Sequence, residues 1–220
     1  MDIYIKWEDG IMSSGVVYKT IANVYDLLEV TYFKDKKTSP RNAVVNLLDE
    51  EDVKILDICS GTGANAINIA KKNSRSKIVG IDLSKKMLAL AKQKIDKENL
   101  QNIRLYKMDA TKTKFQEDTF DVVVISLVLH EVNDIIRGQI LNEAKRVLKK
   151  DGKIIVVEWW ESDKASEKIP FAPIKLMEPN GFREFLKLDM DKYFDQFDLY
   201  INDVIECPYT RVYEIRKYMY

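Results

Sequence analysis

The sequence predicts an α/β protein with a doubly wound, mostly parallel seven-stranded sheet and an antiparallel C-terminal hairpin. From residue 53 to residue 160, short β-branched apolar runs alternate with amphipathic segments of helical length. After residue 196, apolar and polar residues alternate on both sides of Pro208, which is typical of two strands joined by a turn. Strands that alternate with helices indicate the doubly wound arrangement.

Each element follows from a local pattern. The five apolar runs are long enough for strands and nearly continuous, as expected for parallel strands covered on both faces. They are VKILDIC (53–59), SKIVGID (76–82), NIRLYKM (102–108), FDVVVISLVL (120–129) and GKIIVVEWW (152–160). Helices are predicted at 18–29, 40–48, 64–72, 84–99 and 134–150, with a short one inside 179–194. Segments 197–207 and 207–218 form the predicted hairpin.

Composition narrows the functional classes. Lys plus Arg and Asp plus Glu both number 35, so no overall charge draws the protein to nucleic acid or an anionic membrane. The two cysteines, Cys59 and Cys207, are far apart and lack metal-ligand spacing, so we expect neither a disulfide framework nor a metal site. No apolar run reaches 18 residues, and MDIYIKWEDG lacks the basic segment followed by an apolar one that is typical of a secretory leader, so we expect none. We expect one cytoplasmic domain across residues 1–220.

The segment DICSGTGANA (57–66) follows the first strand, where doubly wound sheets bind ligands. Gly61 and Gly63 allow the backbone to approach a ligand closely. GTGANA also fits the dinucleotide pattern G-x-G-x-x-A, and Asp82 lies where an acid would bind a ribose, so an NAD(P)-dependent oxidoreductase is one alternative. Asp57 argues against an oxidoreductase, because its carboxylate, four residues before Gly61, would face the negative charges of a pyrophosphate. A cation suits this place better.

Five segments together resemble the class I S-adenosylmethionine-dependent methyltransferases. The resemblance covers about residues 40–160. Within this family, the sequence is similar to the ubiquinone/menaquinone C-methyltransferases and the phospholipid N-methyltransferases. It implies a Rossmann-like methyltransferase fold with an N-terminal helical lid (1–50), a cofactor-binding core (51–160), a substrate-side insert and helix (161–195) and a closing hairpin (196–220). The segments are VKILDICSGTGANAINIA, KIVGIDLSKKMLALAKQK, KMDATK, FDVVVISLVLHEV and EAKRVLKKDGKIIVVEW.

The resemblance implies S-adenosylmethionine as cofactor and a role for each matching residue. Asp57 would face the methionine amino group, Asp82 the ribose hydroxyls and Asp109 the adenine amino group. The remaining cofactor contacts would come from Cys59, Gly61, Gly63, Leu83, Met87, Ala110, Ser126, Leu127 and, within the lid, Tyr25. Many members carry glycine where Cys59 stands, although the quinone methyltransferases also carry other residues there.

His130 is the only histidine of the chain and follows the fourth strand at the expected substrate entrance. An imidazole is a reasonable general base at neutral pH, so His130 is the catalytic candidate, although a structural role is the competing interpretation. Glu131 and Glu158 are the fallback candidates. Aromatic side chains at both ends of the core, including Trp159, Trp160 and Phe171, could contact a planar or cationic substrate or form ordinary core.

We therefore expect methyl transfer to a small-molecule acceptor, aromatic or amine. A phospholipid or quinone acceptor is the alternative, with peripheral membrane contact, but acidic residues outnumber basic ones in residues 1–52. No nucleic-acid partner is expected, because ISLVLHEV ends the fourth strand where nucleic-acid methyltransferases carry an Asn-Pro-Pro-Tyr-type motif. A regulator that binds the cofactor without catalysis is a further alternative. The sequence leaves the acceptor atom and the oligomeric state open.

Overall fold

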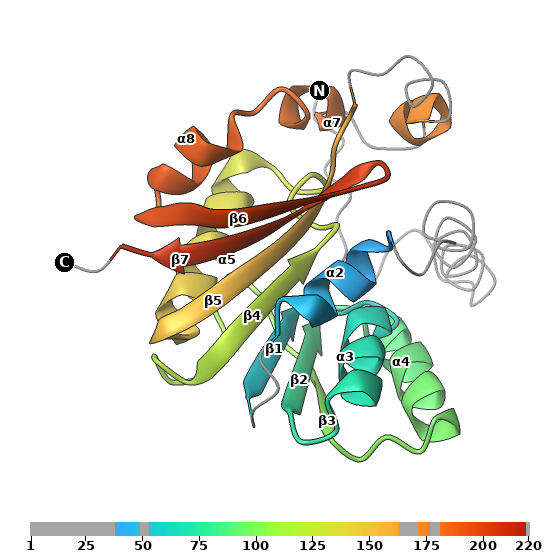
Figure 1. Ribbon diagram of the computed structural model, residues 1–220. Helices are drawn as coiled ribbons and strands as arrows, with labels where there is room; N and C mark the ends of the chain where they lie inside the picture. Colours follow the sequence, from blue (N-terminus) through green and yellow to red (C-terminus); the bar gives the residue numbers. More distant parts are fainter. Residues whose placement is uncertain (1–37, 49–52, 163–170, 177–180, 219–220) are drawn as a thin grey trace.

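A seven-stranded mixed sheet runs through the centre of the computed structural model, which describes residues 38–48, 53–162, 171–176 and 181–218 (Figure 1). The strand order is β3-β2-β1-β4-β5-β7-β6. Strands β1 to β5 pair in parallel, whereas β7 pairs antiparallel with both β5 and β6, which confirms the predicted class. The strands are β1 (Lys54–Ile58), β2 (Lys77–Asp82), β3 (Ile103–Lys107), β4 (Phe120–Ser126), β5 (Leu148–Trp159), β6 (Leu199–Cys207) and β7 (Thr210–Lys217).

Helices cover both faces of this sheet. Figure 1 shows α3 and α4 on one side of the sheet and α5 on the other, as a doubly wound fold requires. The helices are α2 (Pro40–Asn46), α3 (Ala64–Lys72), α4 (Lys85–Lys97), α5 (Asp134–Val147), α7 (Phe182–Phe185) and α8 (Met190–Asp195). Residues 171–176 are also helical. The helix predicted at 18–29 lies outside the described residues.

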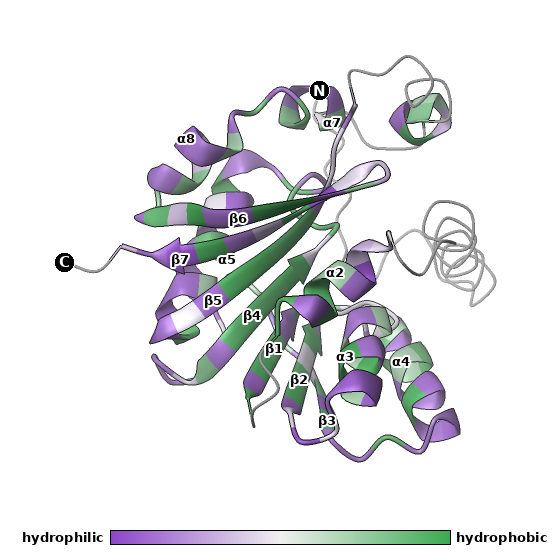
Figure 2. Ribbon diagram, viewed as in Figure 1, coloured by the Kyte–Doolittle hydropathy of each residue, from purple (hydrophilic) through white to green (hydrophobic). Residues whose placement is uncertain are grey.

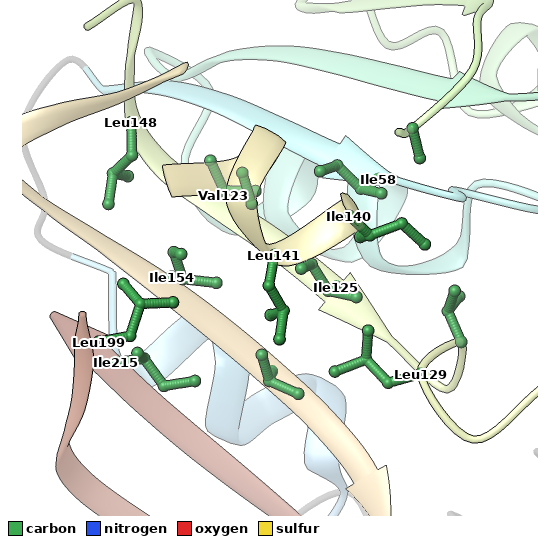
Figure 3. Packing of buried hydrophobic residues seen from close by; sticks show 14 of the residues in the cluster. Ile58, Val123, Ile125, Leu129, Ile140, Leu141, Leu148, Ile154, Leu199 and Ile215 are labelled. Carbon is green, nitrogen blue, oxygen red and sulfur yellow. The ribbon is translucent and has the colours of Figure 1, made fainter. Parts of the chain in front are cut away.

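The alternation of side chains along β4 explains how one sheet supports two cores. Val122 and Val124 pack toward α2 and α3, whereas Val123 and Ile125 pack toward α5. All four are at most 2% exposed, so β4 is apolar at successive positions. Figure 2 shows this apolar character along the central strands, and Figure 3 shows Ile140 and Leu141 of α5 packed over β4 and β5.

Several predicted boundaries differ from the structure. The strand predicted at 120–129 ends at Ser126, because Leu127 adopts a left-handed φ of 54°. The helix predicted at 134–150 ends at Val147, and the next residue, Leu148, pairs with Phe120 and begins β5. Within 179–194 the structure forms two short helices, α7 and α8, in place of one.

The topology predicts where a ligand would bind. β1 lies between β2 and β4. After β1 the chain adds β2 and β3 on one side, and it then returns to add β4 and β5 on the other side, so the direction reverses between β1 and β4. Ligands of doubly wound sheets bind in the crevice at the carboxyl ends of the strands on either side of such a switch point. The residues that follow β1, β2, β3 and β4 therefore share one edge with the end of β5.

Candidate functional site

The turn after β1 is a tight backbone loop that leads into α3. The N–H of Ser60 donates to the carbonyl of Ile81 at 2.9 Å, and the N–H of Gly63 donates to the carbonyl of Ser60 at 2.8 Å. Gly61 has a φ of 52° and Gly63 a φ of 77°, a region that glycine adopts without strain. A Cβ on Gly63 would also lie only 3.1 Å from the Cβ of Ala91. Both the backbone conformation and the space beside Ala91 therefore favour glycine at position 63, whereas at position 61 only the conformation does.

Asp57 precedes this turn, and its carboxyl group is buried. The residue is 1% exposed, and within the described part of the chain its Oδ2 has no hydrogen-bond partner. Burial raises the pKa of Asp57 to about 7, and the charge of Asp82 adds to the increase, whereas the N–H of Ala66 and the charge of Arg41 oppose it. A buried acceptor with no donor indicates a place for a polar or cationic ligand group.

Asp82 ends β2 and joins two backbone turns. Its Oδ2 accepts from the N–H of Gly61 at 2.9 Å, and its Oδ1 accepts from the N–H of Ser84 at 2.7 Å. Burial raises the pKa of Asp82, although these two N–H groups counteract the rise. Each carboxylate oxygen has a second lone pair, so Asp82 can hold the glycine turn and still accept from a ligand hydroxyl.

Negative charge surrounds the thiol of Cys59. Burial raises the pKa of Cys59, and the charges of Asp82, Glu131, Asp57 and Asp109 raise it further. These acids follow four different strands or lie within them, yet all act on one sulfur atom. The thiol is therefore an inert group in an acidic cleft rather than a nucleophile. A cationic ligand would suit these surroundings.

One side of the cleft is apolar. Leu83 is 55% exposed, which is unusual for a leucine beside buried strands, and Met87 is half-buried one helical turn along α4. Ser84 caps this helix by accepting from the N–H of Met87 at 3.3 Å. Asp109, at the end of β3, is exposed and accepts from the N–H and hydroxyl of Thr111 at 2.8 and 2.7 Å.

Of the other residues predicted at this edge, Ser126 and Leu127 are half-buried where β4 ends, whereas Ala110 belongs to the core. Leu127 packs against an apolar cluster from the far end of the chain, which we call the insert cluster: Trp159, Phe171, Ile174 and Phe182. The aromatic residues Trp159 and Phe171 are thus core members. Tyr25 lies outside the described residues.

His130 lies in the interior rather than at an open rim. It is 4% exposed, and its ring meets those of Phe182 and Phe185 edge-on, with centroids 5.4 and 6.1 Å away. Its Nδ1 lies 2.6 Å from Oε2 of Glu158, which is also buried. An imidazole paired with a carboxylate can exchange a proton through its other nitrogen.

The sequence analysis missed two residues that bind the loop after β4, Glu158 and Arg137. Glu158 was only a fallback base, yet its carboxylate also accepts from backbone N–H groups after β4. Arg137 had no predicted role, but its guanidinium donates to the carbonyls of Leu129 and Val132 at 2.7 and 3.0 Å. A charged residue on the inner face of a helix, or inside an apolar strand, is the signal that could have identified both.

Comparison with known proteins agrees with this arrangement. Residues 55–152 match the family described as "Methyltransferase domain". The chain is 31% identical over 144 residues to the demethylmenaquinone methyltransferase of Bacillus cereus (strain ATCC 10987 / NRS 248), a match that covers 64% of this chain and 60% of that protein. The demethylmenaquinone methyltransferase of Bacillus anthracis (strain CDC 684 / NRRL 3495) matches to the same extent. This chain thus spans about three fifths of the length of these relatives.

A solved structure has the same fold. The "SAM dependent methyltransferase from Aquifex aeolicus" superposes with a TM-score of 0.69 at 19% identity, covering 90% of this chain and 97% of that one. At this identity the likeness establishes the fold, a Rossmann-like methyltransferase fold. None of the helices among the described residues has both the length and the apolarity to cross a membrane.

Proposed function

Because residues 55–152 match a methyltransferase domain family, we propose that this chain transfers a methyl group from S-adenosylmethionine to a small-molecule acceptor. The observation that carries the proposal is the buried Oδ2 of Asp57, which has no donor among the described residues and lies in a cleft lined by acids. A ligand with an ammonium and a sulfonium group suits such a cleft. A dinucleotide pyrophosphate would instead bring negative charge toward Asp57.

The residues present fit this cofactor. Asp57 would bind the methionine ammonium, and Asp82 would accept from the ribose hydroxyls with its remaining lone pairs. Leu83 and Met87 would contact the adenine, with Asp109 at its polar edge. Gly61, Gly63, Cys59, Ala110, Ser126, Leu127 and Tyr25 would line the rest of the site. When bound, S-adenosylmethionine supplies a methyl group activated by the neighbouring sulfonium.

His130 is the proposed general base. An acceptor such as a phenol or a carbon acid must lose a proton, and a neutral imidazole accepts one near neutral pH. The nearby carboxylate of Glu158 would stabilise the imidazolium that forms. The protein's main contribution is alignment of acceptor and methyl group, which is worth ~7 to 11 kcal/mol in favourable intramolecular reactions.

We propose an aromatic acceptor of the quinol class. The similarity to two demethylmenaquinone methyltransferases supports a quinone substrate. A phospholipid amine is the second candidate. We further propose a cytoplasmic location, supported by two free cysteines and no disulfide between them.

Calorimetric titration tests the cofactor. S-adenosylhomocysteine should bind with micromolar or tighter affinity, and reduced nicotinamide dinucleotide should not bind. Asp82→Asn keeps the size of the side chain but only one acceptor oxygen, so the affinity should fall at least about tenfold. Asp96→Asn, on the exposed face of α4, is the matched control and should leave the affinity unchanged. Equal affinity in wild type and Asp82→Asn would contradict the ribose assignment.

Mass spectrometry tests the acceptor. The enzyme is incubated with deuterated-methyl S-adenosylmethionine and either a reduced naphthoquinone or phosphatidylethanolamine vesicles. A labelled methyl group on the naphthoquinol supports the quinol proposal. Labelling of the phospholipid alone would replace it with the second candidate.

A further inference from the structure

Glu158 is a buried carboxylate in the penultimate position of β5, beside the proposed base. It is 1% exposed, and burying a charge in this way is costly unless donors surround it. Its Oε1 accepts from the N–H of Val128 at 3.1 Å and of Leu129 at 2.7 Å. Its Oε2 lies 2.6 Å from Nδ1 of His130 and 3.4 Å from the N–H of Trp159. One side chain thus serves three consecutive residues after β4.

This hydrogen bonding fixes the tautomer of the imidazole. Three backbone N–H groups donate to the two carboxylate oxygens, so both oxygens already act as acceptors. An ionised carboxylate only accepts, so Nδ1 of His130 must carry the proton that bridges the 2.6 Å contact. In a neutral imidazole, Nε2 is then the nitrogen that can accept a proton.

The same contacts hold an unusual backbone. Leu127 has a left-handed φ of 54°, a conformation that costs energy for a residue with a Cβ. Its N–H bonds to the carbonyl of Val157 at 2.8 Å, which keeps it at the edge of β5. The next two N–H groups point to Glu158, whereas Arg137 binds the carbonyl of Leu129 from the other side. Residues 127–129 are therefore held from two elements.

We propose that Glu158 is a positioning residue for methyl transfer. Its carboxylate sets the loop of residues 127–129 at the edge of the cofactor cleft and orients His130 as the Nδ1-protonated tautomer, with Nε2 as the basic nitrogen. The kinetic part of this inference rests on the proposed function. The structural part, the tautomer, concerns the protein alone.

Nitrogen-15 NMR tests the tautomer directly. The chain contains one histidine, so tag-free protein gives a single imidazole spin system. In wild type, Nδ1 should resonate in the range of a protonated nitrogen from pH 6 to pH 9. A wild-type Nδ1 in the range of an unprotonated nitrogen would overturn the proposal without any variant.

Glu158→Gln should reverse the tautomer. The single amide oxygen must serve the N–H groups of Val128 and Leu129, so the amide NH₂ faces His130 and Nδ1 becomes an acceptor. Nε2 should then carry the proton. Glu206→Gln, which removes an exposed partner of Arg211 on the edge strand β6, is the matched control and should leave the imidazole spectrum unchanged.

Kinetics of the same variants test the role in catalysis. Glu158→Gln should lower kcat about 100-fold, the usual order for loss of a correctly oriented base, while the affinity for S-adenosylhomocysteine changes less than about threefold. A reversed tautomer with unchanged kcat would overturn the positioning role. If wild type neither binds S-adenosylhomocysteine nor transfers a methyl group, the proposed function fails, whereas the NMR result still decides whether Glu158 orients His130.

Discussion

At the scale of single residues, Asp57 combines a stability cost with a proposed binding role. Its folded-state pKa of about 7 lies above the ordinary 3.8, so folding favours the protonated form. Its contribution to stability is therefore fully present below about pH 4 and is lost as the pH rises toward 7. At higher pH the ligand-free protein contains a buried carboxylate with an unpartnered oxygen.

Asp57→Asn should stabilise the ligand-free protein at pH 8, by about 2 kcal/mol, because the amide does not ionise. The gain should disappear near pH 4, where the wild-type carboxyl group is protonated. The same variant should weaken S-adenosylhomocysteine binding at least about tenfold at pH 8, since the ammonium group loses its counter-charge. Urea unfolding at both pH values and calorimetry measure these changes.

Asp121→Asn is a control that should change the stability at pH 8 in the opposite direction. Although partial burial acts to raise the pKa of Asp121, hydrogen bonds from Lys149 and the N–H of Lys54 outweigh it and lower the pKa. Its contribution is present above the ordinary pKa of an aspartate and is lost as the pH falls. Asp121→Asn should therefore destabilise the protein at pH 8. A destabilised Asp57→Asn at pH 8 would contradict the burial argument.

Cys59 occupies a conformation that suits glycine. Its φ of 53° is left-handed. The raised pKa of its thiol argues against a nucleophilic role for the side chain. Cys59→Gly should be more stable than Cys59→Ala by about 1 kcal/mol, because both remove the thiol but only glycine relieves the strain. Thermal unfolding of the pair measures the difference. Equal stabilities would mean that the turn carries no strain at this residue.

At the scale of elements, the sequence predicted the parallel strands to within a few residues because their β-branched runs are nearly continuous. It failed at the start of β5, where Lys149 to Gly152 resemble a polar turn. The register explains this: Phe120 pairs with Leu148, but Val122 pairs with Lys153, so β5 carries extra residues in a bulge. A bulge depends on the neighbouring strand and cannot be read from one segment.

The sequence contains a local signal for the division between α7 and α8, but the regular spacing of apolar residues hides it. Aromatic and apolar residues recur from Phe182 to Phe194 at helical spacing, which predicts a single helix. Asp189 interrupts it, because its side chain accepts from the N–H of Lys192 at 3.3 Å and begins a new helix. An aspartate inside an apparent helix, followed by helix formers, is a possible N-cap.

Helix α5 is joined to the loop before β4 by a buried acid. Glu143 accepts from the N–H of Thr113 at 2.8 Å and from Arg146 at 2.7 and 2.9 Å. Burial acts to raise the pKa of Glu143, but the bonds from Arg146 and Thr113 outweigh it, so the pKa is lowered. Its contribution to stability is thus present at neutral pH and is lost as the pH falls below about 4.

Glu143→Gln should lower the free energy of unfolding by about 1 to 3 kcal/mol at pH 7, because the loop N–H and the guanidinium lose a charged acceptor. The difference from wild type should shrink at pH 3. Glu98→Gln removes an exposed ion pair with Lys71 and should cost less than about 0.5 kcal/mol. Denaturant unfolding of the three proteins measures both effects. A pH-independent loss would show that the charge of Glu143 is not the cause.

At the scale of the whole molecule, the parts of the site that the sequence could predict are those tied to strand ends. Asp57, Asp82 and Asp109 each follow or end a recognisable strand, and parallel strands bring such positions to one edge. The pair of His130 and Glu158 could not be predicted, because 28 residues separate them and their meeting depends on the pairing of β4 with β5. Long-range register is a property of the folded sheet.

The sheet therefore has a proposed binding edge and an opposite edge, and a ligand should affect them differently. S-adenosylhomocysteine at about 100 times its Kd should stabilise the protein by about 2.7 kcal/mol, since it binds only the folded state. For a chain of this size the corresponding rise in Tm is roughly 5 to 10 °C. Differential scanning fluorimetry measures the rise, with reduced nicotinamide dinucleotide at equal concentration as the control.

Hydrogen exchange should locate that stabilisation. Amides of residues 57–63, 82–87 and 126–131 should exchange more slowly with S-adenosylhomocysteine, because they lie at the carboxyl ends of β1, β2 and β4. Residues 118–121 and 149–152, at the opposite ends of β4 and β5, should change no more than the global stabilisation requires. Protection confined to this opposite edge, or a larger rise in Tm with the dinucleotide, would place the ligand elsewhere and refute the acidic cleft as the binding site.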